Sequence, residues 1–126
     1  MLDMMYEQDY IMRTITNLIR FLSKIIFGKD IAVYGLSKGG EHIQSDRLHR
    51  KLLALLSEGK INEAEDLLFE KFNPKDTRQM MVAIDFYQRL NNLDDEFLKE
   101  NNFSRKEIEE GLRDIASKAG ITIYDI

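Results

Sequence analysis

Two histidines and an aspartate have a spacing that could bind a metal ion. His42, Asp46 and His49 are separated by four and then three residues, so in one helix they would share a face. However, two glycines come shortly before this group, and Ser45 is a typical N-cap residue, which would leave His42 outside the helix. No cysteine and no third histidine completes a ligand set. We therefore interpret the three residues as exposed positions and expect neither a metal nor another cofactor.

A glycine-rich segment, residues 28–44, contains the run GLSKGG, which could cradle a phosphate. A Walker A loop has the pattern G-x-x-x-x-G-K-[ST] between a strand and a helix. Here Lys38 precedes the glycine pair, and no clear strand leads in. A surface connection is the better interpretation. One alternative stays open, in which Tyr34, Lys38 and His42 line a pocket within residues 31–42 for a small ligand or a substrate.

Carboxylates occur in clusters, but none has a recognisable catalytic pattern. Residues 94–96 and 109–110 are consecutive acids, whereas acid–base catalysis needs two carboxylates that converge in a cleft. The Glu-x-x-His pattern of di-iron bundles is missing, as are the G-x-S-x-G and G-x-G-x-x-G motifs. We therefore expect no catalytic residue and a protein that is not an enzyme.

The composition is typical of a single helical globular domain. The chain has 126 residues, one proline and no cysteine, which favours helices over a barrel or sandwich and excludes disulfides and thiolate zinc sites. Its net charge of -4 argues against a nucleic-acid partner bound through bulk electrostatics. The absence of cysteine suits the cytoplasm, which is the compartment we expect.

The longest apolar stretch, DYIMRTITNLIRFLSKIIFGK at residues 9–29, predicts a helix over residues 3–27. Its apolar positions recur at steps of four and three and form two neighbouring lines. Gly28 is a natural helix stop. We expect one line to pack on the helices at 45–72 and the other to meet a second chain. The residues expected to make these contacts are Ile11, Ile15, Leu18, Ile19, Leu22, Ile25 and Ile26.

The same helix could instead lie on a membrane surface through its basic residues Arg13, Arg20 and Lys24. Three acids lie among its first nine residues, and anionic lipid would repel them. The basic residues interrupt every window of about 20 residues that a transmembrane span would need. Acids also stand where a signal peptide carries cations. Membrane contact is therefore the weaker alternative.

Further helices are predicted downstream. A helix that Ser45 opens and a second helix from about Asn62 form a hairpin around Gly59. Residues 75–91 have apolar positions almost all round, which indicates a central, buried helix or one that also contacts a partner. A short helix follows, with Asn92 as its cap.

The last predicted helix runs from Ser104 to Gly120. It begins with a capping box, because Glu107 lies three residues after Ser104. Residues 31–34 and 121–124 have an extended pattern and could pair as a small sheet. The whole chain is then one helical domain. Its parts are a long helix at 3–27, a glycine-rich connection at 28–44, helical hairpins at 45–120 and a short extended tail at 121–126.

The stretch LLSEGKINEAEDLLFE resembles one tetratricopeptide-type repeat. Gly59 and the small Ala64 have the spacing of that motif, and Pro74 lies near its closing proline. The aromatic positions of the motif are leucines here, and no second copy follows about 34 residues later. The resemblance implies a helix hairpin and, by analogy, a role in protein interaction, but no superhelical array.

The N-terminal helix, the glycine-containing connection and this hairpin together resemble a family of small proteins of unknown function from low-GC Gram-positive bacteria. That resemblance spans nearly the whole chain and implies a helical cytoplasmic protein. We therefore predict an all-α bundle of about six helices that is a protein–protein interaction module and forms a homodimer through its N-terminal helix. The alternatives are a small ligand-binding protein or enzyme with a pocket at 31–42, and a peripheral membrane protein.

Overall fold

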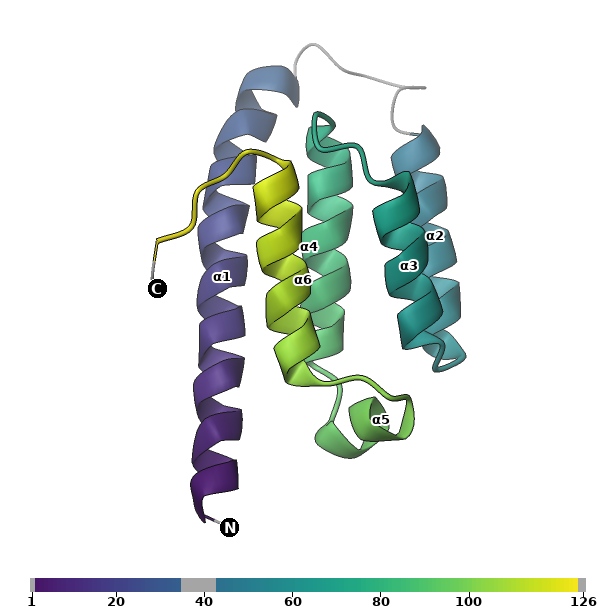
Figure 1. Cartoon of the computed structure of the whole chain (residues 1–126). Coiled ribbons are helices and arrows are strands. Elements are labelled where there is room, and N and C mark those ends of the chain that lie inside the picture. The colour runs from purple at the N-terminus through teal and green to yellow at the C-terminus, as the bar shows by residue number, and fades with distance from the viewer. Residues whose placement is uncertain (1, 35–42, 125–126) are drawn as a thin grey trace.

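The structure is a computed structural model that describes residues 2–34 and 43–124. Within these ranges every regular element is an α-helix, which confirms the predicted all-α bundle of six helices (Figure 1). The helices are α1 (Leu2–Tyr34), α2 (Ile43–Ser57), α3 (Ile61–Lys71), α4 (Thr77–Asn91), α5 (Asp95–Glu100) and α6 (Arg105–Lys118).

Helix α4 lies at the centre of the bundle. It packs against α1, α2 and α6, while α1 and the α2–α3 hairpin lie at opposite edges of the molecule (Figure 1). Buried side chains occupy almost its whole circumference, as the pattern of residues 75–91 predicts. The buried apolar ones are Met80, Val82, Ala83, Ile84, Phe86, Tyr87 and Leu90.

Helix α1 is longer than the sequence pattern predicts. It continues through Gly28 to Tyr34, so the expected stop at residue 27 is wrong, and residues 31–34 are helical rather than extended. Glycine in a helix interior costs only about 1 kcal/mol relative to alanine. Gly28 does not have the positive φ of a C-capping glycine, and the apolar residues after it are compatible with continued helix.

The apolar face of α1 packs on α4 and α6 rather than on the hairpin at 45–72, which corrects the expected docking. The side chains of Ile15, Leu18 and Leu22 are fully buried. Helix α4 stands between α1 and the α2–α3 hairpin, so these side chains pack on α4 and α6 and do not reach the hairpin. Both predicted apolar lines of α1 therefore contribute to the core of one chain.

The α2–α3 hairpin differs from the prediction at its start. Helix α2 begins at Ile43, so Ser45 is not its cap but a buried residue within the first turns. The Ser45 hydroxyl has no hydrogen-bond partner in the part of the chain that the structure describes. The turn to α3 contains Gly59 with φ of 76°, a conformation that favours glycine. Ala64 is fully buried, which suits close helix packing.

The connections before α4 and α5 use aspartates as N-caps. Asp76 accepts a hydrogen bond from the Arg78 amide at 2.9 Å, so α4 begins at Thr77, two residues later than the predicted start at residue 75. Asp94, rather than Asn92, accepts from the Phe97 amide at the start of α5. At both helix starts, an aspartate side chain bonds a free backbone amide. Its negative charge is also favourable at the positive end of the helix dipole.

Helix α6 has the predicted capping box. The Ser104 hydroxyl accepts from the Glu107 amide at 3.3 Å, and the Glu107 carboxylate accepts from the Ser104 amide at 2.8 Å. The tail at 121–124 is neither helix nor strand, so the small sheet with residues 31–34 does not form. Ile121 and Ile123 pack against the core instead.

A buried phenol joins the three helices α3, α4 and α6. Tyr87 of α4 is fully buried, and its hydroxyl donates a hydrogen bond to Glu65 of α3 at 2.6 Å. Gly111 of α6 lies directly against the Tyr87 ring and hydroxyl. Burial raises the pKa of the Glu65 carboxyl, although the hydrogen bond from Tyr87 acts in the opposite direction.

Candidate functional site

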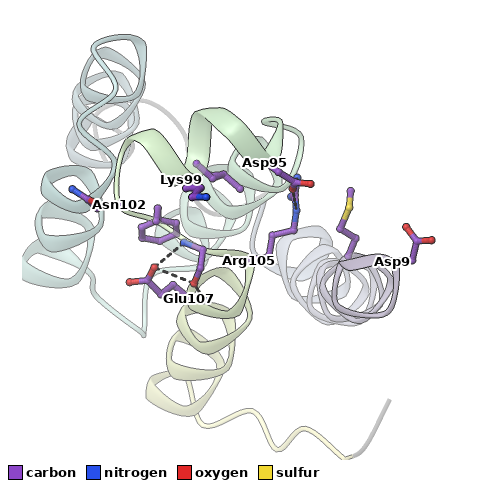
Figure 2. Close-up of a pocket in the computed structure, with 10 residues that line it drawn as sticks. Asp9, Asp95, Lys99, Asn102, Arg105 and Glu107 are labelled. Carbon is purple, nitrogen blue, oxygen red and sulfur yellow. Dashed lines mark hydrogen bonds and ion pairs between the residues drawn. The ribbon is translucent and has the colours of Figure 1, made fainter. Parts of the chain in front are cut away.

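One hollow of the described chain lies where α1 approaches α5 and the start of α6. It has a volume of about 820 Å³ (Figure 2). Asp95, Lys99 and Arg105 lie on one side of it, and Asp9 lies on α1, away from them. A hollow with charged side chains is a natural first candidate for a binding site.

The guanidinium group in this hollow is already fully engaged. Arg105 is buried and donates to the Asn91 carbonyl at 2.8 Å, to the Leu93 carbonyl at 2.7 Å and to Asp95 at 2.9 Å. These two carbonyls lie in the last residue of α4 and just after it, where backbone acceptors lack partners within the helix. Arg105 therefore fastens α5 and α6 to the end of α4.

A second charged group at this hollow, the Glu107 carboxylate, is also used within the protein. The Glu107 carboxylate is held by Ser104 in the capping box, as the dashed lines in Figure 2 indicate. A ligand here would compete with hydrogen bonds that maintain the junction. We therefore regard this hollow as a structural junction rather than the main candidate site.

A second groove, between α1 and α4, is more apolar than this hollow. Its volume is about 530 Å³. The residues that define it are Lys24, Ile26 and Phe27 from α1 and Met81, Ile84 and Asp85 from α4. We call this surface the α1–α4 groove.

Two large apolar side chains of the α1–α4 groove reach solvent. Phe27 is 65% exposed and Met81 is 38% exposed, while Ile26 and Ile84 beneath them are buried. Isolated exposed apolar residues need no explanation, but neighbouring ones above an apolar floor indicate an interaction surface. The α1–α4 groove is therefore the main candidate site.

Opposite charges flank the groove. Lys24 on the α1 side has no ion-pair partner among the described residues. On the α4 side, Asp85 accepts hydrogen bonds from His49 and from Arg89, each at 2.7 Å. Partial burial alone would raise the pKa of the Asp85 carboxyl, but the hydrogen bonds from Arg89 and His49 hold it below its ordinary value. Asp85 therefore stays a carboxylate at the rim.

The residues predicted to mediate interaction lie mostly in the core. Besides the three fully buried side chains of α1, Ile19 is 8% and Ile26 is 3% exposed, while Ile11 and Ile25 are half-buried and pack on the core. Of this set, only Ile26 borders the α1–α4 groove. Within one chain these side chains therefore pack in or against the core, and their contact with a second chain stays a prediction.

The metal hypothesis for His42, Asp46 and His49 finds no support in residues 2–34 and 43–124. His42 lies outside the described residues, Asp46 is exposed, and His49 is bound to Asp85. No group of three metal-binding side chains occurs in these ranges. For the alternative pocket at 31–42, Lys38 and the side chain of Tyr34 also lie outside what the structure describes.

The basic residues proposed for membrane contact form an exposed row on α1. Arg13, Arg20 and Lys24 are all exposed, between the exposed aromatic residues Tyr10 and Phe27. In the described part of the chain, no helix combines the length and apolar character that a membrane span requires.

Sequence reasoning missed most of the groove for identifiable reasons. Phe27 belongs to neither apolar line of α1, and Met81 merely widens the apolar face of α4. The two residues come together only because α1 and α4 pack. The one available signal for the groove was the wide apolar face of residues 75–91. That pattern indicated either a buried helix or a helix that also contacts a partner.

The comparisons with known proteins identify a family but no activity. No curated protein and no solved structure matches the chain significantly. The model of the family of unknown function DUF6483 matches residues 5–120, which include all of α2 to α6 and most of α1. The chain therefore belongs to the DUF6483 family.

Proposed function

We propose that this chain is a non-enzymatic protein-interaction module that pairs with a second copy of itself through the α1–α4 groove. The observation that carries the proposal is the exposed pair Phe27 and Met81 above the buried Ile26 and Ile84. Covering this apolar surface would be favourable by about 25 cal/mol per Å². The core positions of α1 are already occupied within one chain, so a partner would use the groove.

The distribution of charge favours a second copy as the partner. Helices α1 and α4 run in opposite directions (Figure 1), so Phe27 and Met81 are followed along the groove by Lys24 and Asp85. A two-fold axis along the groove would set α1 of each copy on α4 of the other. Lys24 would then face the partner's Asp85, and Phe27 would face the partner's Met81. Each contact would occur twice.

The non-enzymatic assignment rests on how the partly buried carboxylates are used. Glu65 is held by Tyr87, Asp85 by His49 and Arg89, and Glu109 by Arg113. The resemblance of the α2–α3 hairpin to a tetratricopeptide-type repeat also favours a scaffold role. With a cysteine-free sequence, we propose the cytoplasm of a Gram-positive bacterium as its compartment.

Sedimentation velocity over a wide concentration range tests self-association. We expect a weak, concentration-dependent dimer, because the groove is small compared with interfaces of about 800 Å² per partner. Phe27→Glu should abolish it, since it places a charge on the apolar surface. Tyr10→Glu is the matched control, because Tyr10 is equally exposed on the same helix but lies far from the groove. A wild-type protein that stays monomeric at high micromolar concentration contradicts the proposal.

A charge exchange then tests the arrangement of the two copies. Lys24→Glu should weaken the dimer by facing Asp85 of the other copy with a like charge. Adding Gln88→Lys on the α4 side of the groove should restore part of the affinity. If the double variant is no stronger than Lys24→Glu alone, the two-fold arrangement is wrong.

A further inference from the structure

A third hollow lies on the α2–α3 hairpin, at the edge of the molecule away from α1. It extends to the first turn of α4 and has a volume of about 280 Å³. The residues that matter for its chemistry are Arg47, Leu48 and Lys51 of α2, Leu67 and Lys71 of α3, and Gln79 of α4. We call it the hairpin pocket.

The hairpin pocket is cationic although the protein as a whole is acidic. Arg47, Lys51 and Lys71 line it, and no carboxylate does, whereas the whole chain has a net charge of -4. None of the three has an ion-pair partner in the part of the chain that the structure describes. Lys71 alone could be explained by the negative end of the α3 dipole, but Arg47 and Lys51 lie well inside α2.

The spacing of the two α2 cations strengthens this point. Arg47 and Lys51 are four residues apart, so they lie on the same face of the helix, where like charges destabilise it. Lys71 adds a third positive charge from the facing helix of the hairpin. An anion in the pocket would be attracted to each of the three cations, and these attractions would offset the repulsion among them.

A glutamine from the first turn of α4 also lines this pocket. Gln79 is only 6% exposed, and its side-chain oxygen accepts a hydrogen bond from the Asn73 amide at 2.5 Å. Because a backbone amide can only donate, this bond fixes which end of the Gln79 side chain is the oxygen. No described residue accepts a hydrogen bond from the Gln79 amide nitrogen, and Gln79 is one of the residues that line the pocket. The Gln79 amide can therefore donate a hydrogen bond to a ligand in the pocket.

The donor set and the pocket floor together indicate the class of ligand. Three cations and one neutral amide donor suit a phosphate dianion, and an arginine can bind two of its oxygens at once. Leu48 is buried beneath the pocket and Leu67 is half-buried, so an apolar surface is available for a short carbon group. We propose that the hairpin pocket binds a small phosphomonoester through Arg47, Lys51, Lys71 and Gln79.

Thermal unfolding and isothermal titration calorimetry of the full chain provide the test, with inorganic phosphate and phenyl phosphate as probes. Sodium chloride of matched ionic strength controls for general screening. Both probes should raise the unfolding midpoint beyond the chloride control, and phenyl phosphate should bind more tightly because its ring can cover the leucine floor. A midpoint that does not exceed the chloride control overturns the proposal.

Three variants assign the binding to the pocket. Arg47→Gln with Lys71→Gln should weaken binding about tenfold or more, which corresponds to at least about 1.4 kcal/mol. The matched control is Arg13→Gln with Arg20→Gln, which removes the same charge from the exposed row on α1. Gln79→Glu keeps an acceptor for the Asn73 amide but turns a negative oxygen toward the pocket, so it should also abolish binding.

Two outcomes would overturn the assignment. Equal losses in the pocket variant and in the α1 control would mean that the anions respond only to overall charge. Much tighter binding of a single-stranded oligonucleotide through the same residues would mean that the pocket belongs to a nucleic-acid surface. Because Arg47 and Lys71 are exposed, their exchange for glutamine should leave the fold intact. Self-association of the same variant can be measured separately, so failure of phosphate binding and failure of the proposed dimer can be told apart.

Discussion

Gly111 allows α6 to pack directly on the Tyr87 ring of α4. A Cβ atom at position 111 would overlap both the hydroxyl and the ring of Tyr87. Tyr87 cannot move aside easily, since it is fully buried and bonded to Glu65. Protein interiors are packed too densely to absorb such an overlap without a shift of the backbone or a strained rotamer.

We therefore expect Gly111→Ala to destabilise the protein by about 1–3 kcal/mol, the usual cost of overpacking a core. The measurement is urea denaturation followed by circular dichroism. Gly28→Ala is the control, because nothing lies within 4 Å of a Cβ atom at that helical position. That exchange should instead stabilise α1 by up to about 1 kcal/mol. Equal effects of the two substitutions would contradict the packing argument.

Glu65 should make stability depend on pH with a defined sign. Burial raises its folded-state pKa above the ordinary value of 4.5. The folded protein therefore holds this proton more tightly than the unfolded chain does. The contribution of Glu65 to stability is complete below the unfolded pKa and is lost as pH rises through the folded pKa.

Glu65→Gln removes this titration while its side-chain oxygen can still accept the Tyr87 hydrogen bond. We expect the free energy of unfolding of the variant, relative to wild type, to increase as pH rises from mildly acidic to neutral. Urea denaturation at a series of pH values measures the difference. Asp85 has a lowered pKa, so its own contribution has the opposite sign but is common to both proteins. A difference that does not change with pH would show that Glu65 titrates normally.

At the scale of the helices, local sequence signals predict some boundaries well and others poorly. The start of α6 is predictable because Ser104 and Glu107 are three residues apart and both halves of the capping box are local. The end of α1 is not, because Gly28 resembles a stop although its cost within a helix is small. Ser45 resembles a cap but is buried inside α2, where tertiary packing outweighs its local preference.

The candidate sites depend on contacts that no local pattern encodes. The α1–α4 groove needs Phe27 beside Met81, which are 54 positions apart in the sequence. The role of Arg105 depends on backbone carbonyls at the end of α4 and just after it, and every residue type provides such carbonyls. The amphipathic pattern thus predicts which helices exist and which faces are buried, but not which helices become neighbours.

At the scale of the whole molecule, α4 connects two sets of helices that have little contact otherwise. On one side, α1, α4 and α6 pack on each other; on the other, α2 packs on α3 and on α4. Because the same helix contributes its buried side chains to both sides, neither side has a complete core alone. This arrangement favours one cooperative unfolding transition over two.

We expect Leu18→Ala in α1 and Leu52→Ala in α2 each to lower the urea midpoint of the whole molecule. Both side chains are fully buried, so each exchange should cost about 2–5 kcal/mol. Because the chain contains no tryptophan, amide NMR signals followed one by one through a urea titration are the suitable probe. In either variant, signals from α1, α6 and the α2–α3 hairpin should disappear at one common urea concentration. If Leu52→Ala unfolds the hairpin while α1 and α6 stay folded, α4 does not couple the two sides, and the hairpin is an independent unit.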